Sequence, residues 1–222
     1  MIYFDQDFIN FFKELENNNS KIWFDKNRKR YFVAVKEPME RFVNDLIEAY
    51  RVFDTKIDIT YKQAIFRINR DVRFSKDKKP YKVHVGAVIC SGGKKNMIDP
   101  CMYVEIDSQE VRLFSGLYMI DKDRLQKLRE FIAANLKKFK RLLEDKNFKK
   151  KFGKILGEKN KRLPKELQAA AEKQPLIYNK NYYYFVSYPV DFILKNGLIE
   201  KLIEDYEVAI KMNEFIKQGI GR

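Results

Sequence analysis

The chain has 222 residues and a net charge of +14, and 45% of its residues are hydrophobic, including 18 Phe and 13 Tyr. This composition excludes a disordered chain, and no apolar run approaches the roughly 20 residues that span a bilayer. The N-terminus lacks the pattern of a secretory signal, and two cysteines do not make a disulfide framework. We therefore expect a soluble, cytoplasmic protein with no membrane partner, folded as a single domain over residues 1–222.

The N-terminal part of the chain predicts three helices. Helical spacing of apolar residues indicates a helix over residues 5–18, whose first residue is an aspartate suited to N-capping. Ser20 is placed to cap a second helix, and its apolar spacing extends to Tyr31. Pro38 fits the first turn of a third helix, in which residues 39–50 form an apolar stripe. Such stripes are typical of helices that face a core.

The middle of the chain changes to strand periodicity. Apolar and polar residues alternate over residues 81–90, which predicts a strand followed by a mobile turn or loop at 91–96. Residues 101–106 and 111–118 predict two further strands, joined by a turn at 107–110. Because such short connections join antiparallel neighbours, we expect an antiparallel meander.

The C-terminal part predicts helices and one more strand. Residues 121–143 have the pattern of one long helix, and residues 164–174 that of a shorter one. The aromatic segment 182–188 predicts a strand, and residues 198–216 predict a final helix. The expected fold class is α+β, in which an antiparallel sheet of the meander and the later aromatic strand packs against N-terminal, middle and C-terminal helices.

The positive charge is concentrated in two segments. Residues 62–82 carry eight Lys or Arg against two Asp, a net +6, and residues 137–162 carry twelve against three acidic residues, a net +9. The rest of the chain therefore sums to −1. Concentrated charge raises the local concentration of anions more than dispersed charge does. We interpret the second segment, which is mostly lysine, as a solvated helical surface.

Residues 67–82 form the most informative motif. Three arginines within seven residues supply planar forks that suit carboxylate or phosphate, and Asp71 and Asp77 are placed to hold these forks in fixed rotamers. Because two aspartates do not neutralise all of the nearby cations, we predict an anion-binding site. Its candidate ligand-binding residues are Arg67, Arg70, Asp71, Arg73, Ser75, Asp77, Lys78, Tyr81 and Lys82.

Three functions are compatible with this motif. The leading hypothesis is a protein that binds a phosphorylated or otherwise anionic small ligand, a nucleotide or a nucleic acid. One alternative is metal-assisted phosphoryl transfer or phosphoester hydrolysis, in which Asp71 and Asp77, with Glu105 or Asp107, bind Mg²⁺. The other is a structural ion-pair network in an interaction module that binds no ligand. The sequence assigns no catalytic residue, cofactor or oligomeric state.

Other catalytic patterns are missing from the sequence. His84 is the single histidine, and Cys90 and Cys101 lack the paired spacing of zinc ligands, so we assign no metal ligand. There is no Gly-x-Ser-x-Gly elbow, Walker phosphate loop or dinucleotide-binding glycine motif. We interpret His84 as a structural strand residue.

Residues 67–82, which read Arg-Ile-Asn-Arg-Asp-Val-Arg-Phe-Ser-Lys-Asp-Lys-Lys-Pro-Tyr-Lys, resemble the motif of a known family, the domain of unknown function 2461. This resemblance implies an intracellular, single-domain α+β protein and implies no activity. The resemblance extends upstream to Phe12, Leu15, Asn18, Trp23, Phe24, Asn27 and Tyr31, and weaker similarities occur downstream at Gly116 to Met119 and Leu163-Pro164.

Overall fold

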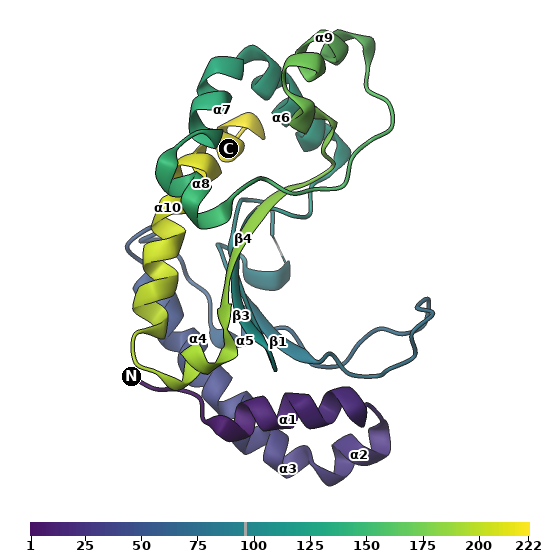
Figure 1. Cartoon of the computed structure of the whole chain (residues 1–222), viewed down its shortest axis with the longest axis vertical. Helices are drawn as coiled ribbons and strands as arrows, with labels where there is room; N and C mark the ends of the chain where they lie inside the picture. Colours follow the sequence, from purple (N-terminus) through teal and green to yellow (C-terminus); the bar gives the residue numbers. More distant parts are fainter. Residues whose placement is uncertain (96) are drawn as a thin grey trace. The chain divides into compact units, whose positions relative to one another are not determined.

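The computed structural model describes residues 1–95 and 97–222, so the predicted loop at 91–96 includes one residue, Asn96, outside the described residues. The chain divides into two compact units (Figure 1). The prediction of a single domain over residues 1–222 stays a prediction. Unit 1 comprises Met1–Asn96, Tyr103–Leu113 and Ser187–Ile203. Unit 2 comprises Met97–Met102, Phe114–Val186 and Glu204–Arg222.

Unit 1 begins with helices whose caps follow from the sequence. The Asp5 carboxylate accepts hydrogen bonds from the amides of Asp7 and Phe8, and the Ser20 hydroxyl accepts one from the amide of Trp23, which confirms both predicted caps. The helical elements of this unit are α1 (Gln6–Asn17), α2 (Lys21–Lys26), α3 (Arg28–Tyr31), the π-helical turn η1 (Phe32–Lys36), α4 (Glu37–Tyr50), α5 (Tyr61–Ala64) and the 3-10 turns η2 (Gly93–Lys95) and η4 (Val190–Leu194).

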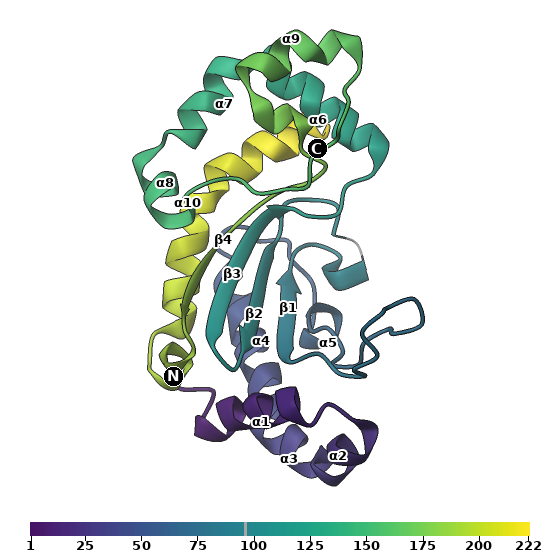
Figure 2. The same cartoon turned by 45° about the vertical axis from the view of Figure 1, so that its right-hand side comes forward.

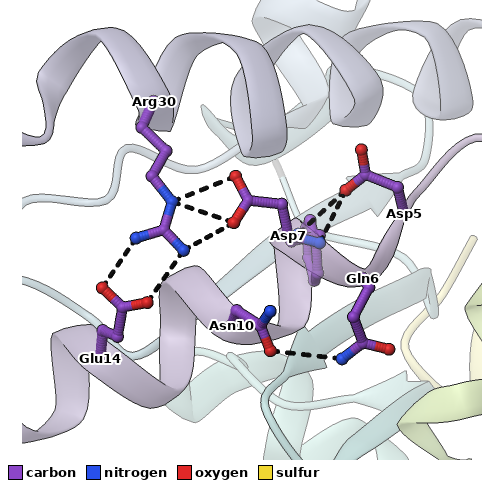
Figure 3. A network of polar contacts seen from close by, with 7 residues as sticks. Asp5, Gln6, Asp7, Asn10, Glu14 and Arg30 are labelled. Carbon is purple, nitrogen blue, oxygen red and sulfur yellow. Dashed lines mark hydrogen bonds and ion pairs between the residues drawn. The ribbon is translucent and has the colours of Figure 1, made fainter.

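An arginine joins the first and third helices. Arg30 of α3 donates from Nη1 and Nη2 to the Glu14 carboxylate at 2.7 and 3.0 Å, and from Nε and Nη2 to the Asp7 carboxylate at 3.0 and 2.6 Å (Figure 3). Both carboxylates belong to α1. We call these three residues the Arg30 clamp. The two carboxylates raise the pKa of the Arg30 guanidinium, with the hydrogen bonds to Asp7 as the largest cause.

The strands form one antiparallel sheet of order β1-β2-β3-β4, which confirms the predicted meander and the α+β class (Figure 2). In β2 and β3 alternate residues are buried on one face, whereas Tyr103, Glu105 and Arg112 lie half-buried on the other face. We call the latter the half-buried face. The strands are β1 (His84–Ile89), β2 (Met102–Asp107), β3 (Glu110–Leu117) and β4 (Tyr182–Pro189).

Unit 2 is mainly helical. A buried polar network lies within it: the Tyr184 hydroxyl donates to Asn213 Oδ1 at 2.7 Å, and Asn213 Nδ2 donates to Ser115 Oγ at 2.9 Å. Its helical elements are α6 (Lys122–Ala134), α7 (Leu136–Leu143), α8 (Lys146–Phe152), α9 (Lys165–Lys173) and the 3-10 turn η3 (Pro175–Tyr178), while α10 (Leu198–Gly219) contributes to both units.

Two asparagines divide helices that the sequence predicts as continuous. The prediction of one helix over residues 121–143 is wrong, because α6 ends at Ala134 and is followed by its cap Asn135. The second predicted helix is likewise divided at Asn27. The side-chain amide donates in each case to the carbonyl four residues earlier: Asn135 to Phe131 at 2.9 Å, and Asn27 to Trp23 at 3.0 Å. Such side-chain bonds compete with the continuing backbone ladder, which is why the apolar spacing alone misses the break.

Candidate functional site

The motif of residues 67–82 lies on an extended arm that we define as residues 66–83, between α5 and β1 (Figures 1 and 2). Its outgoing and returning halves are paired by an isolated antiparallel bridge between Asn69 and Tyr81 and by backbone hydrogen bonds. The Arg70 amide donates to the Pro80 carbonyl at 2.8 Å, and the Lys82 amide donates to the Ile68 carbonyl at 2.8 Å. The segment is therefore a ribbon with defined register, and residues 71–79 form its tip.

Two groups outside the arm fix where it begins and returns. Lys94 Nζ donates to the carbonyls of Lys62 and Ile65 at 2.7 and 2.6 Å, at the outgoing end. At the returning end, the Asn19 side chain makes two 3.0 Å hydrogen bonds to the backbone of Tyr81. These bonds orient the arm by groups that are distant in the sequence.

Tyr81 itself is buried. Its ring stacks on Phe24 with a centroid distance of 4.0 Å and an interplanar angle of 14°. Burial also raises the pKa of the Tyr81 hydroxyl. The sequence predicts that Tyr81 binds the ligand. In the structure its ring makes a packing contact at the base of the arm.

The two aspartates of the tip each pair with an arginine, as the sequence predicts. Arg73 pairs with Asp71 at 2.7 Å, and Arg70 pairs with Asp77 at 2.6 Å. The hydrogen bond from the Arg73 side chain is the largest cause that lowers the pKa of Asp71, and the Lys79 amide is the largest cause that lowers the pKa of Asp77. All of these carboxylates are exposed, so the pairs are surface pairs of small energetic weight.

The other predicted residues of the tip bind backbone or face solvent. Lys78 Nζ donates to the Val72 carbonyl at 3.0 Å, and the Ser75 amide donates to the same carbonyl at 3.3 Å. The side chain of Phe74 is 95% exposed. The tip is therefore a closed turn that presents an aromatic ring and several cations.

The base of the arm has cations and no ion pair. Lys82 is half-buried, with its Nζ 5.3 Å from the centroid of the Phe66 ring. Burial, and next the charge of Arg67, lower the pKa of the Lys82 ammonium, while Glu105 acts in the opposite direction. Within residues 1–95 and 97–222, no carboxylate lies within ion-pair distance of Arg67 or Lys82. This pair, which we call the arm-base pair, therefore holds positive charge without a direct ion pair, and Glu105 offsets only part of that charge.

Next to the arm-base pair, a carboxylate is surrounded by three side chains on the half-buried face. Glu105 Oε2 lies 3.4 Å from His84 Nε2 and accepts a 3.0 Å hydrogen bond from the Tyr103 hydroxyl. Glu105 Oε1 lies 3.4 Å from an Arg112 guanidinium nitrogen. Arg112 also pairs with Asp107, which shares its strand with Glu105. These residues come from β1, β2 and β3, and we call them the sheet-face cluster.

Burial is the largest influence on the titratable groups of this cluster. Burial lowers the pKa of His84, and the cations Lys82 and Arg112 lower it further, whereas Glu105 raises it. Burial also raises the pKa of the Tyr103 hydroxyl. His84 is therefore neutral at neutral pH, and Tyr103 keeps its proton as a hydrogen-bond donor.

A glycine makes room for this arrangement. The Tyr103 ring lies over Gly86 of β1, where an added Cβ would collide with the Tyr103 hydroxyl and ring. A side chain at residue 86 would have to displace Tyr103 and its hydrogen bond to Glu105.

The sequence does not reveal the sheet-face cluster as a unit. Alternation does place Glu105 and Asp107 on one side of a strand, but the register that brings His84 and Arg112 to Glu105 is a tertiary property. The hypothesis of a magnesium site at Asp71 and Asp77, with Glu105 or Asp107, stays a prediction. In the described part of the chain, no three His, Cys, Asp or Glu side chains are grouped so that they would hold a metal ion.

The second basic segment belongs to unit 2. Its Phe139, Phe148 and Phe152 are buried, while Lys137 and Lys150 are exposed, so α7 and α8 are amphipathic. This pattern fits the solvated helical surface that the sequence predicts.

Comparison with known proteins identifies a family. A family model described as a conserved hypothetical protein (DUF2461) matches residues 7–215. Searches of curated proteins and of solved structures found no match. No helix among the described residues is long and apolar enough to cross a membrane.

Proposed function

The chain belongs to the DUF2461 family, and we propose that it binds a phosphorylated or otherwise anionic ligand through its arm. The observation that carries this proposal is the arm-base pair. A half-buried ammonium beside a guanidinium, with no carboxylate at ion-pair distance, costs stability unless an anion occupies the site. Structural ion-pair networks do not need such an arrangement.

The tip supports the same proposal more weakly. Lys76 and Lys79 are exposed, and no carboxylate lies within ion-pair distance of either among the described residues. They attract an anion over a distance, whereas Arg67 offers the planar fork that orients a phosphate. Attraction by the tip and orientation at the base are thus separate contributions.

Binding measurements on charge-removing variants test the proposal. We expect Arg67→Ala and Lys82→Ala each to weaken the binding of methyl phosphate about tenfold to a hundredfold, because a hydrogen bond to a charged group contributes about 1.5–3 kcal/mol. Lys150→Ala in unit 2 is the matched control, since it removes one exposed cation outside the arm. Equal affinities for the wild type and all three variants would contradict the proposal.

Nucleic acid is a second candidate ligand, and one observation favours it. Phe74 is 95% exposed, and the Arg73 guanidinium lies 5.9 Å from its ring centroid, an arrangement that suits stacking on an unpaired base. If the arm alone binds single-stranded nucleic acid, its unpaired cations neutralise about four phosphates, and log affinity falls with log salt at a slope of about −3.

Phe74→Ala tests the second candidate ligand, nucleic acid. It should weaken binding of a single-stranded oligonucleotide by about 1–3 kcal/mol without changing the salt slope. A slope steeper than about −4 would require the basic segment of unit 2 as well. No binding at low salt would remove nucleic acid as a ligand.

A further inference from the structure

Three groups of the arm and sheet act on one another electrostatically. Arg67 acts on Lys82, and Lys82 acts on His84 two residues further along the chain. The His84 side chain is 29% exposed, so it is partly accessible. Lys82 Nζ lies 5.3 Å from the centroid of the Phe66 ring, and the Phe66 ring packs on the Tyr103 ring with 5.8 Å between centroids. Because Tyr103 contacts Glu105, which faces His84, Lys82 and the imidazole lie on one patch of unit 1.

Glu105 lies in this patch and offsets part of the positive charge of Lys82. Its carboxylate is 15% exposed, one oxygen faces Arg112, and the other accepts the hydrogen bond from Tyr103. Glu105 Oε2 also faces Nε2 of His84, which leaves Nδ1 as the second ring nitrogen for a ligand. The carboxylate thus orients the imidazole.

We propose that the arm base binds a terminal phosphate, with His84 as the third binding residue beside Arg67 and Lys82. This inference rests on the proposed function and names the ligand class of the same site. The terminal phosphate is that of a phosphomonoester, and His84 takes up one proton as the ligand binds.

The charge of the ligand distinguishes a phosphomonoester from a diester. A phosphomonoester has a second pKa of about 6 and carries close to two negative charges above about pH 7, whereas a phosphodiester carries one. Arg67 and Lys82 face this charge, and a protonated His84 adds a third cation. The site should therefore prefer methyl phosphate to dimethyl phosphate by about tenfold or more.

The protonation of His84 is coupled to binding. In the free protein, burial and the cations Lys82 and Arg112 keep the imidazole neutral, against the influence of Glu105. A bound dianion adds negative charge beside the ring and favours the imidazolium. Tyr103, the other titratable neighbour in this cluster, keeps its proton at neutral pH because its pKa is raised. Proton uptake then makes affinity fall as pH rises, by up to about tenfold per pH unit.

Calorimetry of methyl phosphate binding tests this inference. The titrations use the wild type between about pH 7 and pH 9, where the ligand is already dianionic, in two buffers of different ionisation enthalpy. We expect uptake of about one proton per bound ligand near the lower pH. His84→Gln keeps a polar side chain without the titration, so it should abolish proton uptake and weaken binding about tenfold. Glu105→Gln should reduce the uptake, because it removes the carboxylate that stabilises the imidazolium.

The outcomes separate the two proposals. Binding by the wild type without proton uptake, or with equal affinity for dimethyl phosphate, overturns the role of His84 and leaves the proposed function standing. Absence of methyl phosphate binding, or no effect of Arg67→Ala and Lys82→Ala, overturns both. Should His84→Gln fail to fold in thermal melts, the proton uptake and ester preference of the wild type decide alone.

Discussion

The Arg30 clamp and the arm-base pair belong to the same unit but differ in how their positive charge is paired. Arg30 meets two carboxylates that together accept from all three guanidinium nitrogens, and these contacts raise its pKa (Figure 3). Lys82 lies against an aromatic ring, and burial, followed by the charge of Arg67, lowers its pKa against the influence of Glu105. The first arrangement stabilises the folded chain without a ligand, and the second costs stability until an anion binds.

The same contrast separates a structural arginine from a binding one in this chain. Motif composition does not make the distinction, because Arg and Asp occur in both regions. What distinguishes them is whether a carboxylate from another element pairs with the cation. Asp7 and Glu14 of α1 pair with Arg30 of α3, whereas no carboxylate among the described residues lies within ion-pair distance of Arg67. Substitutions that remove each cation should therefore change stability with opposite signs.

The largest effect is expected from Arg30→Ala. This change leaves Asp7 and Glu14 without their partner and removes the link between two helices, so unfolding free energy should fall by about 1.5–3 kcal/mol. For a chain of this size that loss lowers the melting temperature by about 4–10 °C. Methyl phosphate binding should not change.

Arg28→Ala is the matched control for the Arg30 clamp. Arg28 pairs with Asp25, three residues earlier in the chain, and both side chains are more exposed than Arg30. Its loss should change unfolding free energy by less than about 1 kcal/mol. Equal losses for Arg28→Ala and Arg30→Ala would show that the clamp is only another surface pair.

Lys82→Met should give a smaller change of opposite sign. Methionine keeps the unbranched stem and removes a half-buried ammonium next to Arg67, so unfolding free energy should rise by about 0.5–1 kcal/mol at neutral pH. Because the folded pKa of Lys82 is lowered, the cost of its charge is present at neutral pH and disappears as pH rises above the unfolded value. In urea unfolding, the difference in unfolding free energy between variant and wild type should therefore be smaller at about pH 10 than at about pH 7.

The gain should come with a loss of function. Lys82→Met is expected to weaken methyl phosphate binding about tenfold or more, together with its higher stability. A destabilised Lys82→Met protein would mean that the ammonium supports the fold, and would favour the interpretation of the motif as a structural network.

What the sequence predicts well in this molecule is local. Asp5 and Ser20 each cap the helix that follows within three residues, and Asp71 and Asp77 pair with arginines of their own motif. Apolar spacing finds α4 and the strands because burial on one face of an element follows its period.

What the sequence does not predict depends on register and on distant segments. Asn19 and Tyr81 meet across 62 positions, and nothing in the motif itself shows that the Tyr81 ring is buried. Likewise, the contact between His84 and Glu105 depends on how β1 pairs with β2, so a single strand histidine gives no sign of its carboxylate neighbour.

The smallest effects on stability are expected at the tip of the arm, where Asp71→Asn and Asp77→Asn remove carboxylates from exposed pairs. Asp71→Asn should leave the melting temperature at neutral pH unchanged within error. Asp77→Asn should lower it slightly, because Asp77 pairs with Arg70, whose side chain is less exposed than that of Arg73.

The dependence on pH has a definite sign. The pKa values of Asp71 and Asp77 are lowered in the folded chain, so their contribution is present above the unfolded value of about 3.9 and is lost as pH falls below it. The small difference in melting temperature between wild type and Asp77→Asn should therefore vanish in acid.

At neutral pH each variant frees the guanidinium of one arginine, so methyl phosphate should bind about twofold to threefold more tightly. A large loss of melting temperature in either variant, with unchanged methyl phosphate binding, would instead show that the tip is a structural network like the Arg30 clamp. Removing a carboxylate lowers the melting temperature strongly at neutral pH only if that carboxylate stabilises the fold.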